Sequence, residues 1–246
     1  MIETTAIAQL DAENPWPGLD SFEENAHAFF HGRDREAVSL LRHVLDVPVT
    51  VLYGRSGLGK TSLLRAGLFP LLREHHFLPV YVRFDARPDA APLTRQLRDS
   101  VRNAIQAAAP DAALPSDEEA LWDYLHRGDL ELWSERNYPL TLIIVLDQFE
   151  EIFTLAEQTP DPVRAFRDDL GDLAENRIPA DLAARTENDA AVAARFDLRS
   201  RNYKLLISLR EDFLPELERA SAHSHARSLA AATPAHAGRR CAGSST

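Results

Sequence analysis

The sequence predicts an α/β fold, a three-layer αβα sandwich on a mainly parallel sheet, and three observations lead to this prediction. Apolar runs of strand length alternate with segments in which apolar residues recur every three or four positions, as in amphipathic helices. Two of the runs, at 140–146 and 203–209, are almost continuous, which is typical of strands buried on both faces of a parallel sheet. A glycine-rich stretch at 54–59 joins a third run to a helical pattern. With 246 residues, 45% of them hydrophobic, the chain can bury one substantial core.

Taken in order, the chain predicts a loose leader at 1–13 and one domain at 14–219. Two prolines and a glycine make the start of this domain extended. Strands are then expected near 49–54, 78–85, 140–146 and 203–209, and helices near 34–45, 59–73, 93–105, 121–125, 149–156 and 211–219, with one or two more within 157–202. Pro70 should kink or interrupt the second of these helices, because proline has no N–H to donate.

After Arg219 the composition changes. Residues 220–246 contain no Asp or Glu, are dominated by Ala, Ser, His and Arg, and show neither helical nor strand periodicity. Such a segment buries too little apolar surface to offset the entropy of ordering. We therefore expect a disordered or aberrant tail.

Residues 49–64, VTVLYGRSGLGKTSLL, carry the pattern that most directly indicates function. They fit the phosphate-loop template G-x-x-x-x-G-K-[ST] in its required place between a strand and a helix. Glycines let the loop curve around a phosphate with its N–H groups unshielded, and the following helix adds unpaired N–H groups. The sequence thus predicts a P-loop that binds a nucleoside triphosphate through Gly54, Arg55, Ser56, Gly57, Leu58, Gly59, Lys60, Thr61 and Ser62. Lys60 would reach the outer phosphates and Thr61 would ligate Mg²⁺; the alternative is a coincidental glycine turn.

Asp147 ends the apolar run at 140–146 and is the second chemical landmark. An acid at the carboxyl end of such a strand faces the crevice in which α/β sheets bind ligands, and in P-loop proteins it holds Mg²⁺. The alternative role is a helix cap. Glu150 and Glu151 follow in the first turn of a helix, where carboxylates are favoured in any case, but one of them could orient the attacking water.

Two arginines complete the set of candidate residues. Arg210 ends the run at 203–209 and would face the same crevice near the γ-phosphate, unless it is an ordinary surface arginine. Arg33 follows Gly32 in a turn before a helix. This turn could lie against the base or ribose of the nucleotide, or could be an exposed turn at the start of the helix.

Composition narrows the functional classes. The net charge of −11 argues against a nucleic-acid partner, which would require clustered Lys and Arg. Cys241 is the only cysteine, so the chain has neither an internal disulfide nor a cysteine-based zinc site. The sequence has no signal peptide pattern and no apolar run long enough to cross a bilayer. These features predict a cytoplasmic protein without a membrane partner.

Several stretches together resemble a known family: NPWPGLDSF, FFHGRDRE, VLYGRSGLGKTSLLRAGLFPLL, VLDQFEEIFTL and LISLREDFLPELE. They are similar to the nucleotide-binding domain of STAND NTPases (signal transduction ATPases with numerous domains), of the group called novel STAND NTPase 1. The resemblance implies a P-loop NTPase fold of the ASCE/AAA-like kind, with Asp147 as the Mg²⁺ acid and Arg210 as a sensor of the γ-phosphate. It also implies a contact from Gly32 and Arg33 near the adenosine. Gln148 stands where many relatives of this class carry the water-activating glutamate, which leaves Glu150 or Glu151 for that role.

The resemblance further implies a signalling switch in bacterial signalling or defence. Such a domain would bind ATP and ADP, hydrolyse ATP slowly as a weak ATPase, and self-associate to activate effector or sensor domains absent from this chain. Family members continue into a winged-helix region and repeats, so the chain looks truncated or frame-shifted after Arg219. The alternatives are a small-molecule kinase and a non-catalytic interaction fragment.

Overall fold

The structure, a computed structural model, describes residues 16–18, 20–87, 89–223 and 233–236. In this part of the chain a parallel sheet of five strands forms the centre, in the order β2-β3-β4-β1-β5. Its strands are β1 (Val49–Gly54), β2 (Phe77–Arg83), β3 (Thr141–Asp147), β4 (Tyr203–Arg210) and β5 (Thr233–His236). This arrangement confirms the predicted α/β fold. It also inserts β4, which ends at Arg210, between the strand of the glycine-rich motif and the strand that ends at Asp147.

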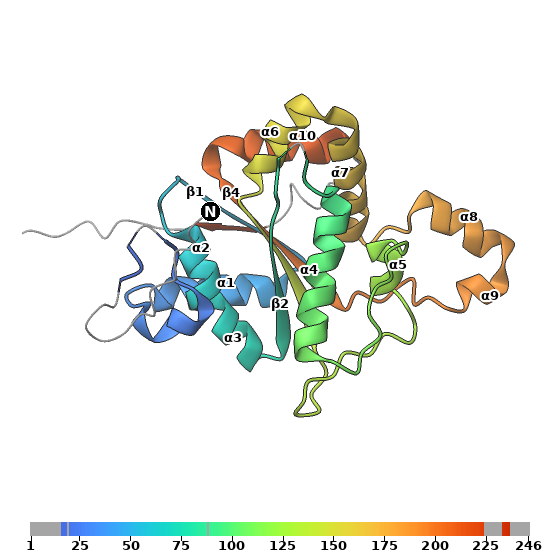
Figure 1. Ribbon diagram of the computed structural model, residues 1–246, viewed down its shortest axis with the longest axis horizontal. Coiled ribbons are helices and arrows are strands. Elements are labelled where there is room, and N and C mark those ends of the chain that lie inside the picture. Colours follow the sequence, from blue (N-terminus) through green and yellow to red (C-terminus); the bar gives the residue numbers. More distant parts are fainter. Residues whose placement is uncertain (1–15, 19, 88, 224–232, 237–246) are drawn as a thin grey trace, which may run out of the picture.

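Helices cover both faces of the sheet and so form the outer two of three layers (Figure 1). The first layer consists of η1 (Glu24–Phe29), α1 (Asp34–Asp46), the π-helical segment η2 (Leu63–Leu68) and α3 (Phe69–Glu74). The second consists of α4 (Leu93–Ala108), α5 (Leu121–Leu125), α6 (Glu150–Gln158), α7 (Pro160–Glu175) and α10 (Leu214–His223). In β3, Ile143 packs in the first layer's core and Ile144 in the second's, and both are fully buried. Burial on both faces explains why this strand reads as a continuous apolar run.

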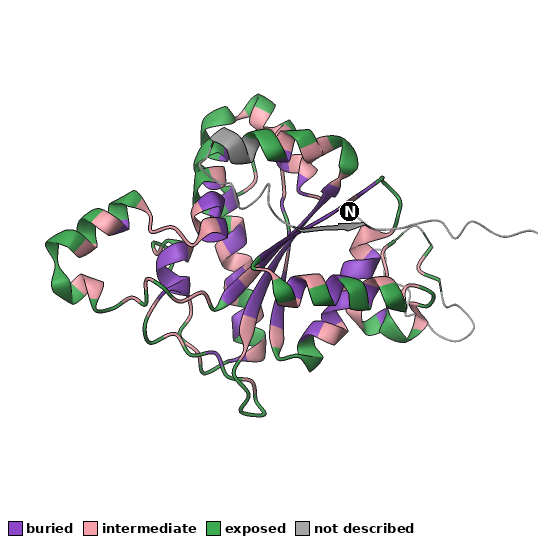
Figure 2. Cartoon of the chain, turned by 180° about the vertical axis from the view of Figure 1, so that it is seen from behind, coloured by how far each residue is buried: buried purple, intermediate pink, exposed green. Residues whose placement is uncertain are grey.

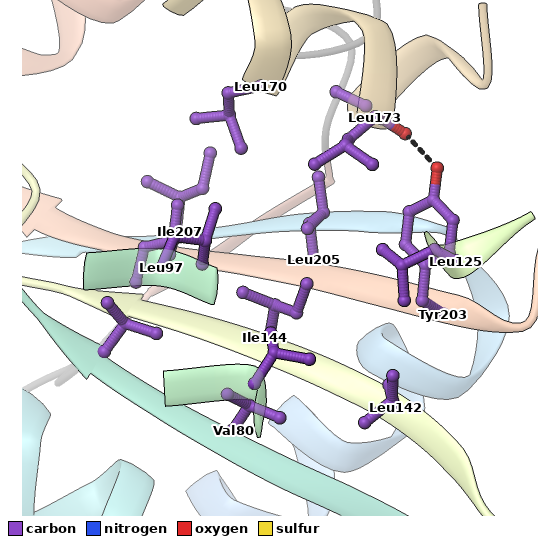
Figure 3. Packing of buried hydrophobic residues seen from close by; sticks show 14 of the residues in the cluster. Val80, Leu97, Leu125, Leu142, Ile144, Leu170, Leu173, Tyr203, Leu205 and Ile207 are labelled. Carbon is purple, nitrogen blue, oxygen red and sulfur yellow. Dashed lines mark hydrogen bonds between the residues drawn. The ribbon is translucent and has the colours of Figure 1, made fainter. Parts of the chain in front are cut away.

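The larger core lies under the second layer. Figure 3 shows Leu97 of α4, Leu170 of α7, and Ile144 and Ile207 of the sheet within this core. At the edge of this core the buried hydroxyl of Tyr203 donates a hydrogen bond of 2.9 Å to the carbonyl of Leu173. A buried phenol needs such a partner, so this contact fixes the end of α7 against the start of β4.

Two further helices, α8 (Ala180–Asn188) and α9 (Ala190–Ala193), stand away from the sheet and are largely exposed (Figures 1 and 2). The sequence predicts one or two helices within 157–202, whereas α7, α8 and α9 all lie there. This pair of helices is attached to the rest of the protein through α8, by the buried side chain of Leu182 and by an ion pair of 2.7 Å between Arg185 and Asp123.

The helix that follows the glycine-rich loop runs without a gap from Lys60 to Glu74, and its type changes just before Pro70. It begins as α2 (Lys60–Ser62), passes through the π-helical η2 and ends as α3. In an α-helix the amide of residue 70 would bond to the carbonyl of Ala66, and proline has no such amide. The ring Nδ1 of His27 lies 2.6 Å from that carbonyl and donates to it instead. The proline therefore allows η1 to dock on this helix.

The segment expected to be a tail contains secondary structure at two places. Helix α10 runs to His223, past the expected limit at Arg219, and β5 pairs in parallel with β1 from Thr50 to Tyr53. The alanines at 220 and 222 gave no strand or core pattern, but alanine is a strong helix former, which suits the end of α10. The rest of this segment, 224–232 and 237–246, and the expected leader at 1–13 lie outside the described residues. No helix of the described residues has the length and hydrophobicity to span a bilayer.

Candidate nucleotide site

The glycine-rich loop connects the carboxyl end of β1 to α2 and turns at two glycines with left-handed backbone. Gly57 has a φ of 76° and Gly59 a φ of 69°. Side chains with a Cβ rarely adopt such angles, so the sequence had to place glycine at these two points. A Cβ on Gly59 would also lie only 3.1 Å from the guanidinium of Arg33. The loop therefore has the shape that exposes backbone N–H groups to an anion.

Lys60 bends back over the loop. Its ammonium donates hydrogen bonds of 2.9 Å to the Gly54 carbonyl and 3.1 Å to the Arg55 carbonyl. Burial lowers the pKa of Lys60 below its ordinary value, and the carboxylates of Glu150 and Asp147 oppose this shift. A half-buried cation held only by neutral carbonyls is suited to receive a negatively charged ligand.

The side chains of Thr61 and Asp147 are in contact at the carboxyl ends of the strands. The Thr61 hydroxyl donates a hydrogen bond of 2.6 Å to Asp147 Oδ2, and the Tyr81 hydroxyl donates one of 3.0 Å to the same oxygen. The backbone N–H of Gln148 donates to Oδ1 at 3.0 Å. Asp147 is only 1% exposed, so all of its charge is directed toward this group of donors and the adjoining cleft. Burial and the nearby Asp147 carboxylate raise the pKa of Tyr81, which keeps its hydroxyl protonated.

This pair of oxygens fits Mg²⁺. Mg²⁺ prefers hard oxygen ligands and is usually held by one or two carboxylates together with phosphates of the substrate. A hydroxyl and a carboxylate in hydrogen-bond contact, next to a loop shaped for phosphate, provide that donor set. Bound Mg²⁺ would neutralise charge on the phosphates.

The two glutamates have different partners. Glu150 Oε2 accepts the backbone N–H of Arg210 at 3.2 Å, which ties the start of α6 to the end of β4. Glu151 instead forms an ion pair of 3.1 Å with Arg83 at the end of β2. Of the charged groups acting on Lys60, Glu150 has the strongest effect. The structure thus separates two residues that sequence alone left equivalent.

Arg210 lies at the cleft, but its side chain is held locally. Its Nη2 donates to Asp212 Oδ2 at 2.5 Å, and its guanidinium carbon lies 5.6 Å from the centre of the Phe213 ring. Its Nε is buried without a hydrogen-bond partner among the described residues. The side chain therefore retains donor capacity for a further acceptor.

These side chains surround one cleft of about 850 Å³ at the carboxyl ends of the strands. Parallel strands deliver their carboxyl ends to one side of a sheet, which is where α2, α6 and α10 follow (Figure 1). The predicted residues that line it are Ser56, Gly57, Gly59, Lys60, Thr61, Ser62, Asp147, Glu150, Glu151 and Arg210.

Five predicted residues do not line the cleft: Gly32, Arg33, Gly54, Arg55 and Leu58. Gly54 and Leu58 contribute carbonyls that Lys60 and Arg33 bond, and Arg55 forms an ion pair of 3.1 Å with Glu211. Arg33 donates to the carbonyls of Leu58 and Gly59 at 2.8 and 3.1 Å and pairs with Glu36. In this arrangement Arg33 holds the loop from outside the cleft.

Sequence reasoning missed several lining residues, among them Asp20, Ser21, Arg65, Tyr81, Arg83 and Thr154. Asp20 and Ser21 belong to the extended segment at the start of the domain, in which no site residue was predicted. That segment is docked on the P-loop helix, where Phe22 donates its N–H to the Ser62 hydroxyl at 3.1 Å and Glu23 pairs with Arg65. Tyr81 and Arg83 do carry a partial sequence signal, because they are polar residues in the strand predicted at 78–85, which the structure pairs with the Asp147 strand.

The comparison with protein families agrees with the motifs. The sequence profile of the family described as novel STAND NTPase 1 matches residues 15–237, which extends beyond Arg219. Among curated proteins, no match was found. A Walker-type ATPase of Pyrococcus abyssi is similar in structure, with a TM-score of 0.47 and 16% identity over 89% of this chain. The ORC2 protein of Aeropyrum pernix, solved in ADPNP and ADP complexes, has a TM-score of 0.34 and 18% identity over 78% of this chain. The chain spans 57% and 52% of the length of those two structures.

Proposed function

The chain belongs to the novel STAND NTPase 1 family, and from this premise we propose that it is an ATP-binding switch domain that hydrolyses ATP slowly. The observation that carries the proposal is the contact of 2.6 Å between Thr61 and Asp147 beside the P-loop. This contact unites the phosphate-binding motif with an acid 86 positions later in the chain. In P-loop NTPases a hydroxyl and an acid in these places hold the Mg²⁺ of the bound nucleotide.

The chemistry of the site would consist of positioning and charge neutralisation. Lys60, Mg²⁺ and Arg210 would spread the negative charge that the γ-phosphoryl group carries during transfer. The carboxylate that would orient water is Glu150, since it stabilises the charge of Lys60 more than any other charged group does and Glu151 is paired with Arg83.

Slow turnover is part of the proposal. Glu150 accepts the N–H of Arg210, and the Arg210 side chain bonds Asp212. If Arg210 turned toward the γ-phosphate, it would leave Asp212, and the contact of its backbone with Glu150 would move with it. Such a rearrangement links the state of the nucleotide to the position of the β4 end, as a switch requires.

The biological context is proposed from the family. ATP would favour self-association and ADP the separate chain, and association would activate effector or sensor domains in bacterial signalling or defence. The chain would work in the cytoplasm with ATP and ADP as its ligands.

The test is a titration of the purified chain with a fluorescent ATP analogue in Mg²⁺, followed by single-turnover phosphate release. We expect the analogue to bind. We also expect phosphate to be released more slowly than the roughly 1–100 s⁻¹ turnover of kinases, at a rate that does not depend on added acceptors. Light scattering after size exclusion, with a slowly hydrolysed ATP analogue or ADP, tests association. A Lys60→Ala chain that binds and associates like the wild type would contradict the proposal, and phosphate transfer to an acceptor would indicate a kinase.

A further inference from the structure

Tyr81 is a residue of the cleft that neither the P-loop motif nor the Asp147 motif contains. It lies on β2, where its partner in the β2–β3 register is Val145. Two positions later in the same register, Arg83 lies opposite Asp147. Its hydroxyl donates to Asp147 Oδ2 at 3.0 Å, the oxygen that also accepts from Thr61 at 2.6 Å. Because Gln148 donates to the other oxygen, both ends of the carboxylate are restrained.

The position of the Tyr81 ring is set independently of Asp147. The guanidinium of Arg65 lies over the ring, 4.8 Å from its centre, and the ring of Phe69 meets it edge-on at 6.2 Å. Arg65 is itself held by an ion pair with Glu23. A ring held by these two contacts can impose its orientation on a flexible carboxylate, whereas a mobile ring would only follow it.

From this geometry we infer that Tyr81 is a positioning residue for Mg²⁺, acting through Asp147. Its hydroxyl fixes the rotation of the carboxylate, so that Asp147 and Thr61 present their oxygens together to a cation on the nucleotide phosphates. The inference rests on the proposed function. Thr61 can turn its hydroxyl toward the cation, and Tyr81 then remains the donor that keeps Oδ2 in place.

The experiment uses Tyr81→Phe in the full chain, which removes the hydroxyl and keeps the ring contacts with Arg65 and Phe69. Affinity for fluorescent ADP is measured in EDTA and across a series of Mg²⁺ concentrations. Partners that orient a metal ligand typically contribute about 10–100-fold in metal affinity. We expect the Mg²⁺ concentration for half of the affinity gain to rise about tenfold and the affinity in EDTA to stay within about twofold.

Two controls show whether the effect passes through Asp147. Tyr138→Phe removes a hydroxyl from an exposed tyrosine outside the cleft and should leave both values unchanged. In an Asp147→Asn background, Tyr81→Phe should add nothing further to the Mg²⁺ requirement, since residues acting through one group are not additive.

Three results would overturn the inference. These are an unchanged Mg²⁺ requirement, an equal loss of affinity with and without Mg²⁺, and a chain that fails to fold, which would show that the hydroxyl supports the fold and not the metal acid. Wild-type protein that binds no nucleotide would instead refute the proposed function. Wild-type binding enhanced by Mg²⁺, with Tyr81→Phe identical to it, would refute only the role of Tyr81.

Discussion

The hydroxyl of Thr61 donates a hydrogen bond of 2.6 Å to Oδ2 of Asp147, although the strands that precede these residues are not neighbours in the sheet. β1 leads to Thr61 and β3 ends at Asp147, and β4 lies between them. The contact therefore passes across the end of β4, next to Arg210. A ligand that separates Thr61 from Asp147 would therefore act next to the end of β4, which carries Arg210.

The first prediction concerns the charge of Asp147. Asp147→Asn keeps the shape of the side chain but removes the negative charge that would attract Mg²⁺. We expect the gain in ADP affinity on adding Mg²⁺ to disappear. Binding of ATP in EDTA should strengthen by a few-fold, because a buried carboxylate no longer repels the triphosphate. Asp161→Asn, on an 88% exposed side chain of α7, is the matched control. Equal losses with and without Mg²⁺ would show that Asp147 only supports the loop.

The second prediction is a pH dependence that arises from Lys60. Burial lowers the pKa of Lys60 below 10.5, and phosphate binding favours the charged ammonium. The affinity for Mg-ATP should therefore be highest below the pKa that Lys60 has in the free protein, and should decline as the pH rises through that pKa. Lys60→Arg stays charged throughout, so its affinity should be weaker but flat between pH 7.5 and about 10. Lys60→Ala should bind about 10- to 100-fold more weakly at pH 7.5. A flat wild-type curve measured by calorimetry would contradict this.

The third prediction separates Glu150 from Glu151. Glu150→Gln keeps an oxygen for the N–H of Arg210 but cannot accept a proton from water. It should slow single-turnover hydrolysis by about 100-fold with Mg-ATP affinity unchanged. Glu151→Gln is the matched control, because that carboxylate is already paired with Arg83. We expect its rate to fall by less than about threefold. The reverse pattern would assign the water to Glu151.

Sequence patterns predicted the parts of this protein that depend on local rules. The P-loop and the buried strands ending in Asp147 and Arg210 each follow from residues close together in the chain. A parallel sheet then collects the strand ends at one side, which is why Lys60, Thr61, Asp147 and Arg210 line one cleft.

The remaining features depend on contacts between distant segments, which periodicity does not encode. The side-chain partners of Glu150 and Glu151 are set by the ends of β4 and β2. The sequence left Arg33 either near the base or ribose or in an exposed turn, and the structure directs its donors to the loop carbonyls. β5 is only four residues long and includes Pro234. Proline is tolerated at the edge of a sheet but weakens any sequence-based strand prediction.

The fourth prediction concerns the contact between Arg210 and Asp212. The two side chains are 43% and 58% exposed, and such an ion pair contributes at most about 1 kcal/mol. A γ-phosphate in the cleft would therefore displace Asp212 easily, and the pair would set how strongly ATP is preferred over ADP. Asp212→Asn should raise the ratio of ATP to ADP affinity by a few-fold, whereas Arg210→Ala should reduce the ratio to about one with ADP affinity unchanged. Asp85→Asn breaks the pair between Asp85 and Arg87, which has the same spacing and distance but lies outside the cleft, and should have no effect. Competition titrations with both nucleotides measure the ratio. An Arg210→Ala chain that still prefers ATP would mean that the γ-phosphate is detected elsewhere in the cleft.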